Sequence, residues 1–278
     1  MRIFVSGACG YIGSALVPHL LANNHQVVAF DPQWFGNGSL PENDNLTIYK
    51  NDLRGPEYGW LNEDKLHEAM KGCTAFIHLA GITNNNECEK DPEEAASINW
   101  GLFENIAKRC YNYGVKRFIF PSSAAAYGNS DKPLTEDTPL HPTTPYGTYK
   151  SKCEEVLRQS KMKWFILRPA GVFGYAPRMR FDLTVNMMTA HAALNGKILV
   201  AGGEQVRPHV HIRDLIDVIL RLLTANIESN TFNVVYSNST VMDAAKRVKT
   251  TVGKWLKRDV EIIVSERTDD RSYAVSGD

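Results

Sequence analysis

Short apolar runs alternate with longer amphipathic segments along the first two-thirds of the chain. The runs predict strands at residues 3–5, 26–30, 46–49, 75–79, 117–120 and 164–167. Several are apolar at every position, which is typical of parallel strands buried on both faces. Helices are predicted around 11–23, 63–71, 92–113 and 145–160. This alternation indicates an α/β fold with a doubly wound parallel sheet and right-handed crossovers.

The rhythm changes after Arg168. Residues 170–210 are rich in glycine and proline and contain one helical stretch around 182–195. A strand-like run at 232–235 and a helix near 241–253 follow. We therefore predict a Rossmann-type domain over residues 1–169 and a smaller C-terminal substrate-binding lobe over 170–278, from which some segments return to the main sheet.

Composition narrows the class of protein. Thirty-one basic residues balance thirty-one acidic ones, so no overall field attracts nucleic acid or anionic lipid, although a local basic patch is compatible with this balance. No apolar run approaches the ~20 residues that span a bilayer. The five cysteines are scattered and include no Cys-x-x-Cys pair, which favours free thiols over disulfides or a zinc site. We expect a cytoplasmic protein without a leader peptide, a metal, or a nucleic-acid or membrane partner.

The first strand is followed directly by Gly7, Gly10 and Gly13, and the last two flank Tyr11 and Ile12 at the start of a helix. Glycines allow a sharp turn and a close approach to a pyrophosphate, although a tight strand-to-helix turn alone also explains them. Asp31 ends the second strand, where a carboxylate can accept hydrogen bonds from both hydroxyls of the adenosine ribose and would repel a 2′-phosphate. The pattern favours NAD over NADP; the alternative is that Asp31 is a turn residue.

Tyr146 and Lys150 are four residues apart on a predicted helix and therefore share a face. A neighbouring ammonium favours the phenolate and lowers the pKa of a tyrosine. Ser122 and Ser123 follow the fifth strand at its carboxyl end, where doubly wound sheets bind ligands. A hydroxyl there would hold a reacting alcohol or carbonyl beside Tyr146. Each signal alone has a structural explanation, namely a chance spacing for the pair and helix capping for the serines.

Together with further motifs, these residues resemble the extended short-chain dehydrogenase/reductase family, particularly its nucleotide-sugar epimerases and dehydratases of the UDP-glucose 4-epimerase type. The matching segments, in chain order, are the glycine loop, Asp31, residues 51–54, 78–81, Asn99, 122–123 with 127–128, 133–137, 145–150, 167–169 and 207–214. The resemblance spans nearly the whole chain.

The resemblance implies a role for each site residue. Ser123, Tyr146 and Lys150 would be catalytic. The NAD-binding residues would be Gly7, Gly10, Tyr11, Ile12, Gly13, Asp31, Asp52, Leu53, Leu79, Ala80, Gly81, Asn99, Tyr146, Lys150 and Pro169. Arg207 would hold the substrate diphosphate, and Asn186 and Ser123 would also contact the substrate. From the residues alone, Asn99 is equally explained by helix packing and Arg207 by a surface charge.

The resemblance also implies the reaction. An NAD-dependent nucleotide-sugar epimerase would oxidise the C4 hydroxyl of a hexose to a transient keto sugar and reduce it on the other face. An NAD(P)H-dependent 4-keto-sugar reductase and a non-catalytic dinucleotide-binding regulatory protein are the alternatives. Dehydratases carry Asp and Glu after the catalytic hydroxyl, where this chain has Ala124 and Ala125, so we do not expect dehydration.

Two departures and one partner complete the expectations. Gly171 replaces an asparagine that many relatives carry, and relatives continue with a closing helix beyond Asp278, where this sequence ends. The resemblance implies a homodimer formed by the helices around 92–113 and 145–160. The aromatic residues Trp100, Phe103, Tyr111 and Tyr113 either form that interface or face the sheet.

Overall fold

Seven parallel strands form the central sheet in the order β10-β6-β5-β4-β1-β2-β3. The computed structural model describes residues 1–36, 40–54, 63–266 and 271–277. The strands are β1 Arg2–Ser6, β2 Gln26–Asp31, β3 Leu46–Lys50, β4 Ala75–His78, β5 Arg117–Pro121, β6 Lys163–Pro169 and β10 Asn230–Val234. The order reverses between β1 and β4, which confirms the predicted doubly wound, Rossmann-type α/β fold.

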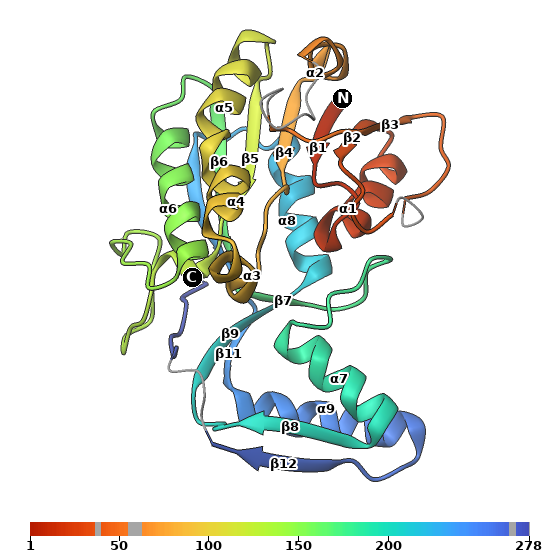
Figure 1. The fold of residues 1–278 in the computed structure, drawn as a ribbon, viewed down its shortest axis with the longest axis vertical. Coiled ribbons are helices and arrows are strands. Elements are labelled where there is room, and N and C mark those ends of the chain that lie inside the picture. The colour runs from red at the N-terminus through yellow and green to blue at the C-terminus, as the bar shows by residue number, and fades with distance from the viewer. Residues whose placement is uncertain (37–39, 55–62, 267–270, 278) are drawn as a thin grey trace.

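Helices cover both faces of this sheet (Figure 1). On one face lie α1 Tyr11–Ala22 and α8 Ile212–Thr224; on the other lie α2 Glu63–Met70, α5 Phe103–Asn112 and α6 Pro145–Arg158. Alternate residues of β1 supply the two cores, since Ile3 and Val5 pack with α1 and α8 while Phe4 packs with α5. The carboxyl ends of the strands point toward the lower lobe, so loops at this edge meet that lobe.

Helix α8 was not predicted from the sequence. Its apolar residues recur at 212, 215, 216, 219, 222 and 223, which is a helical period and a readable signal. The helix packs against α1, and the chain then returns as β10, which pairs with β6 in parallel. Two elements from beyond residue 169 thus complete the main sheet and its cover.

The helix predicted over 92–113 is divided. A short helix α3 Asn85–Lys90 precedes it, then come α4 Pro92–Ala96, a π-helical turn Ser97–Gly101 and α5. Asp91 caps α4 as expected, because its side chain accepts a hydrogen bond from Glu94 N at 2.9 Å. The wider π turn carries Asn99, and its side chain is turned inward and buried.

The C-terminal lobe has its own small sheets. Strands β7 Gly171–Phe173, β9 Val206–His211 and β11 Ser237–Thr240 form one, and β8 Lys197–Ala201 with β12 Glu261–Ser265 forms the other. Helices α7 Thr184–Asn195 and α9 Val241–Leu256 pack with β8 around a separate apolar core. The described part of the chain contains no helix long and apolar enough to cross a membrane. The division of roles between residues 1–169 and 170–278 stays a prediction.

Candidate active site

The glycine loop makes a turn that only glycine fits. Gly7 has φ +69°, and a Cβ there would lie 2.6 Å from Ala80 N, in the loop after β4. A Cβ on Gly13 would lie 2.4 Å from Gly7 O. The start of α1 is therefore pressed against the β1 and β4 ends, and its first N–H groups open onto a cavity that Gly10 also lines.

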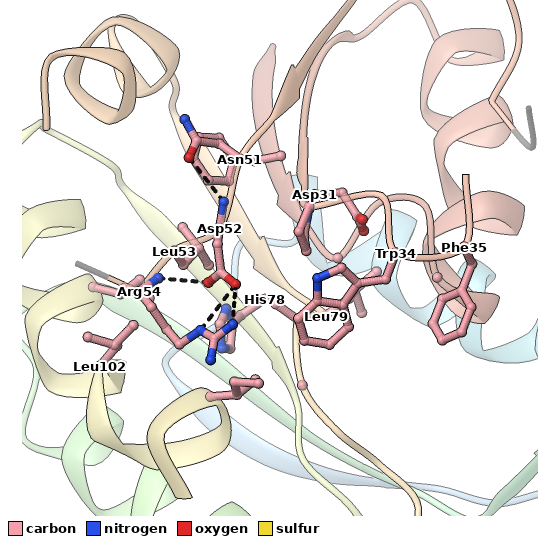
Figure 2. A pocket seen from close by; sticks show the side chains of 18 residues that line it. Asp31, Trp34, Phe35, Asn51, Asp52, Leu53, Arg54, His78, Leu79 and Leu102 are labelled. Atoms are coloured by element: carbon pink, nitrogen blue, oxygen red, sulfur yellow. Dashed lines mark hydrogen bonds and ion pairs between the residues drawn. The ribbon is translucent and has the colours of Figure 1, made fainter. Parts of the chain in front are cut away.

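Asp31 lies at the far side of the same cavity (Figure 2). Its Oδ2 accepts a hydrogen bond from Cys9 N at 3.0 Å and its Oδ1 one from Gln33 N at 2.7 Å. Burial raises the pKa of this carboxyl, and the two backbone donors oppose the rise. A carboxylate offers about four acceptor positions, so Asp31 keeps two for a ribose diol.

The part of the cavity wall around Asp52 was only partly predicted. Asp52 and Leu53 line it, together with the exposed Trp34 and Phe35, which sequence reasoning missed. Figure 2 shows Asp52 and Arg54 paired on one side of the cavity, with Trp34 on the opposite side. Arg54 Nη2 lies 2.8 Å from Asp52 Oδ2. Arg54 Nη1 also lies 3.3 Å from Glu94 Oε1, so its guanidinium joins two carboxylates at this wall of the cavity.

The other predicted cofactor residues fall into two groups. Leu79, Ala80 and Gly81 line the cavity. Six more do not line it. Ile12 packs on the core beside α1, and Tyr11 donates to Gly174 O at 2.7 Å. Asn99 bonds both the N–H and the C=O of Ile82 at 2.9 Å, Pro169 ends β6, and Tyr146 and Lys150 lie on α6. The position of Asn99 shows that it holds the loop after β4, beneath Gly81.

Ser123 and Tyr146 come together because α6 approaches the turn after β5 closely. Ser123 caps the 3-10 turn Ala124–Ala126, accepting from Ala125 N at 3.1 Å. A Cβ on Gly147 would lie 2.6 Å from Ala125 O, so only glycine permits this approach. Thr144 caps α6 through Gly147 N at 3.2 Å. Ser123 lies close enough to Tyr146 for its hydroxyl to oppose the effect of burial on the pKa of the phenol.

Lys150 lies on the same face of α6 as Tyr146, with Nζ 5.6 Å from the centre of the tyrosine ring. Its Nζ donates to Pro121 O at 2.9 Å and stacks over Phe120 at 4.5 Å. Burial lowers the pKa of Lys150 to about 8. The charge of Lys150 also acts on His78, a cavity-lining imidazole that burial holds neutral.

Burial raises the pKa of Tyr146, against the expected lowering. Two groups oppose the rise, first the positive charge of Arg180 and then the hydroxyl of Ser123. Arg180 was not predicted. It reaches the site from the loop before α7, held by Asp182 Oδ2 at 2.5 Å and by Thr83. Without a cofactor charge, desolvation of the phenol outweighs these groups.

A second cavity of about 440 Å³ lies beside Arg180, between the loop after β4 and the C-terminal lobe. Arg207 and Arg271 line it, and Arg207 donates to the backbone carbonyl of Arg271. Asn186 lies elsewhere, because its amide bonds Gly174 N, Tyr11 Oη and Arg180 O. The predicted substrate contact of Asn186 stays a prediction; the structure shows it fixing the loop that carries Arg180.

A dinucleotide cradle next to a tyrosine–lysine pair defines the class of short-chain dehydrogenases/reductases. Within that class the chain belongs to the NAD dependent epimerase/dehydratase family, whose model matches residues 3–235. The UDP-glucose 4-epimerases of Lactobacillus helveticus and Lacticaseibacillus casei are each 28% identical to it. The alignments cover 98% and 89% of this chain and 90% and 81% of those proteins, respectively.

Solved structures agree. The UDP-glucose 4-epimerase of Thermotoga maritima with UDP-glucose superposes with a TM-score of 0.83 at 26% identity, covering all of this chain and 90% of that one. MoeE5 in complex with UDP-glucuronic acid and NAD gives 0.83 at 24% identity, over 99% and 90% of the two chains, which supports the fold. The cofactor is NAD. The tight turn of the glycine loop fits its pyrophosphate, and the two remaining acceptor positions of Asp31 fit its ribose diol.

Proposed function

We propose that the protein is an NAD-dependent nucleotide-sugar epimerase that inverts C4 of a nucleotide hexose through a transient keto sugar. One observation carries this proposal, the placement of Tyr146 and Lys150 on one face of α6 and beside Ser123, with Lys150 Nζ 5.6 Å from the centre of the tyrosine ring. Burial and then the positive charge of Lys150 lower the pKa of His78, which lines the dinucleotide cavity. The positive charge of Arg180, which lines the second cavity, opposes the rise that burial causes in the pKa of Tyr146. The activities of the two 28%-identical relatives support it.

The residues of the chain perform the proton chemistry. Ser123 holds the C4 hydroxyl, and the Tyr146 oxygen takes its proton as the carbon is oxidised. Bound NAD⁺ supplies the hydride acceptor and returns the hydride, so the reaction needs no net oxidant. Tyr146 then gives the proton back to the C4 oxygen of the turned keto sugar. Lys150, fixed by Pro121 O, would keep a positive charge beside both Tyr146 and the cofactor ribose.

The second cavity supports a nucleoside diphosphate as the handle of the substrate. Arg207 and Arg271 are neighbours in its wall, and guanidinium groups bind phosphate oxygens in pairs. The lobe formed by β7, β9 and α7 would then hold the nucleotide while the sugar reaches Tyr146. Asn186 would contribute through the loop it fixes.

NMR of the protein with NAD⁺ and UDP-, GDP-, CDP- and dTDP-hexoses tests the proposal. We expect a new C4 configuration without net NADH, and a loss of about 10²–10⁴ in rate for Tyr146→Phe with NAD binding retained. A 4,6-dehydrated product would contradict the proposal, since Ala124 and Ala125 carry no acid or base. Consumption of NADH with a 4-keto sugar, and no epimerisation, would instead identify a reductase.

We further propose a homodimer through α5 and α6, measurable by light scattering. Tyr111 is 52% exposed, Trp100 is partly buried and contacts Lys152, and Tyr113 is partly buried and contacts His67. Phe103 cannot contribute, because it is buried against Phe118 and His78 of the sheet. A cytoplasmic location in carbohydrate metabolism is also proposed, supported by five free, buried cysteines; cell fractionation checks it.

A further inference from the structure

His209 lies two residues after Arg207 on β9, so both side chains project from the same face of the strand. Both line the second cavity. Across the strand pair, His209 is in register with Gly171 of β7. A Cβ on Gly171 would lie 3.8 Å from His209 Nδ1. Gly171 itself has no side chain to cover the imidazole, and from β7 the ring of Phe173 packs edge-on against it, with the ring centres 6.4 Å apart.

The imidazole has an unsatisfied atom. His209 is 6% exposed, and its Nε2 has no hydrogen-bond partner among the residues that the structure describes. Asn85 Oδ1, in the wall formed by the start of α3, is a second such atom lining the same cavity. Buried polar atoms are almost always paired, since an unpaired one has lost its water without compensation. A ligand in this cavity can satisfy both.

Charge selects the kind of ligand. Burial, followed by the positive charges of Arg207 and Arg247, lowers the pKa of His209 and keeps the ring neutral. A neutral imidazole has one N–H donor. Arg207 and Arg271 both line this cavity, and their positive charges favour an anion over a cation. A phosphate oxygen satisfies both conditions, because it accepts a hydrogen bond and is negatively charged.

We propose that His209 Nε2 donates a hydrogen bond to a phosphate oxygen of a nucleoside diphosphate held by Arg207. The inference rests on the proposed function and adds His209 to the residues that bind the diphosphate. Nε2 is covered in the structure, so a small rotation of the ring about Cβ–Cγ accompanies binding. Asn85 Oδ1, on the other wall, then accepts from a hydroxyl of the attached sugar.

Calorimetric titration with UDP tests this inference, in parallel with GDP, CDP and dTDP. The tightest of these nucleotides is then titrated into three variants. His209→Phe keeps the ring volume but removes both nitrogens, and we expect its Kd to rise about tenfold or more. His209→Gln places an amide near the position of Nε2, so its Kd should remain within about threefold of that of the wild type. His209→Asn places the amide near Nδ1 and should bind as weakly as His209→Phe.

Each outcome is decisive. NAD affinity serves as the control for folding and should be unchanged in all three variants. Equal nucleotide affinity for His209→Phe and wild type would overturn the role of His209 and leave the proposed function standing. If His209→Phe fails to bind NAD, the comparison of Gln with Asn decides, and equal weakening by both overturns the inference. Wild type that binds NAD but no nucleoside diphosphate would overturn the proposed function itself.

Discussion

Glu154 and Arg168 form an ion pair that is buried on all sides, with Arg168 Nη2 2.8 Å from Glu154 Oε2. Ser122 donates to Glu154 Oε1 at 2.5 Å, and Arg168 donates to Tyr127 Oη at 2.7 Å. The pair thus links α6 and β6 to Ser122 and Tyr127, which lie on either side of Ser123 in the sequence. It supports the position of Ser123 from inside the protein, and neither partner lines either cavity.

Removing one partner leaves a buried charge alone. We expect Glu154→Ala to lower the free energy of unfolding by about 3–5 kcal/mol, measured by urea denaturation. Glu104→Ala is the matched control, because Glu104 is likewise a helical glutamate in an ion pair, with Lys108 at 2.7 Å, but both of these side chains are exposed. Its cost should stay below about 1 kcal/mol. Similar costs for the two variants would show that the buried pair contributes no more than the exposed one.

Gly7→Ala should abolish NAD binding. Its φ is +69° and its Cβ would overlap the backbone of Ala80, so the loop must move. Gly114→Ala is the control, since Gly114 has φ +78° with nothing within 4 Å of the added Cβ. It should lose about 1 kcal/mol of stability through backbone strain and bind NAD normally. Fluorescence titration with NADH distinguishes the two variants. An unchanged affinity of Gly7→Ala for NADH would contradict the prediction that the loop containing Gly7 binds the cofactor.

The turnover rate should fall as the pH rises through about 8. The pKa of Lys150 is lowered to about 8 by burial, so alkaline solution converts its ammonium to an amine and removes the charge beside Tyr146. The kcat/KM profile between pH 6 and 10 measures this limb. In Lys150→Arg the guanidinium stays charged throughout this pH range, because its pKa is about 12 or higher, so the remaining activity should lack the limb. A limb that persists in this variant would assign the titration to another group.

Acid should destabilise the protein partly through His78. Burial lowers the pKa of His78 to about 3, so between about pH 6.5 and 3 the unfolded chain binds a proton that the folded chain does not. Stability is therefore complete above pH 6.5 and declines by up to about 1.4 kcal/mol per pH unit below it. His78→Gln should reduce this slope in urea titrations at pH 7, 6 and 5. An unchanged slope would assign the acid sensitivity to carboxyl groups.

Local sequence signals predicted the parts of the site whose geometry is local. The spacing of Gly7, Gly10 and Gly13 determines one turn, and the spacing of Tyr146 and Lys150 determines one helix face. Arg180 and His209 were beyond reach, because their positions depend on how the C-terminal lobe meets the sheet. The buried pair of Glu154 and Arg168 joins elements whose packing no short spacing encodes. Helix α8 was different, since its apolar period was present and was overlooked.

Strand β10 has a consequence for how the polypeptide is made. It adds to the sheet beside β6, yet it is synthesised some sixty residues later, after most of the C-terminal lobe. A nascent chain that has only just completed β6 therefore displays an unpaired, apolar edge and lacks α8 over one face. Such an edge is a template for pairing with another chain. The edge of β6 therefore stays unpaired until residues 230–234 have been synthesised, and chaperones can bind the intermediate during this interval.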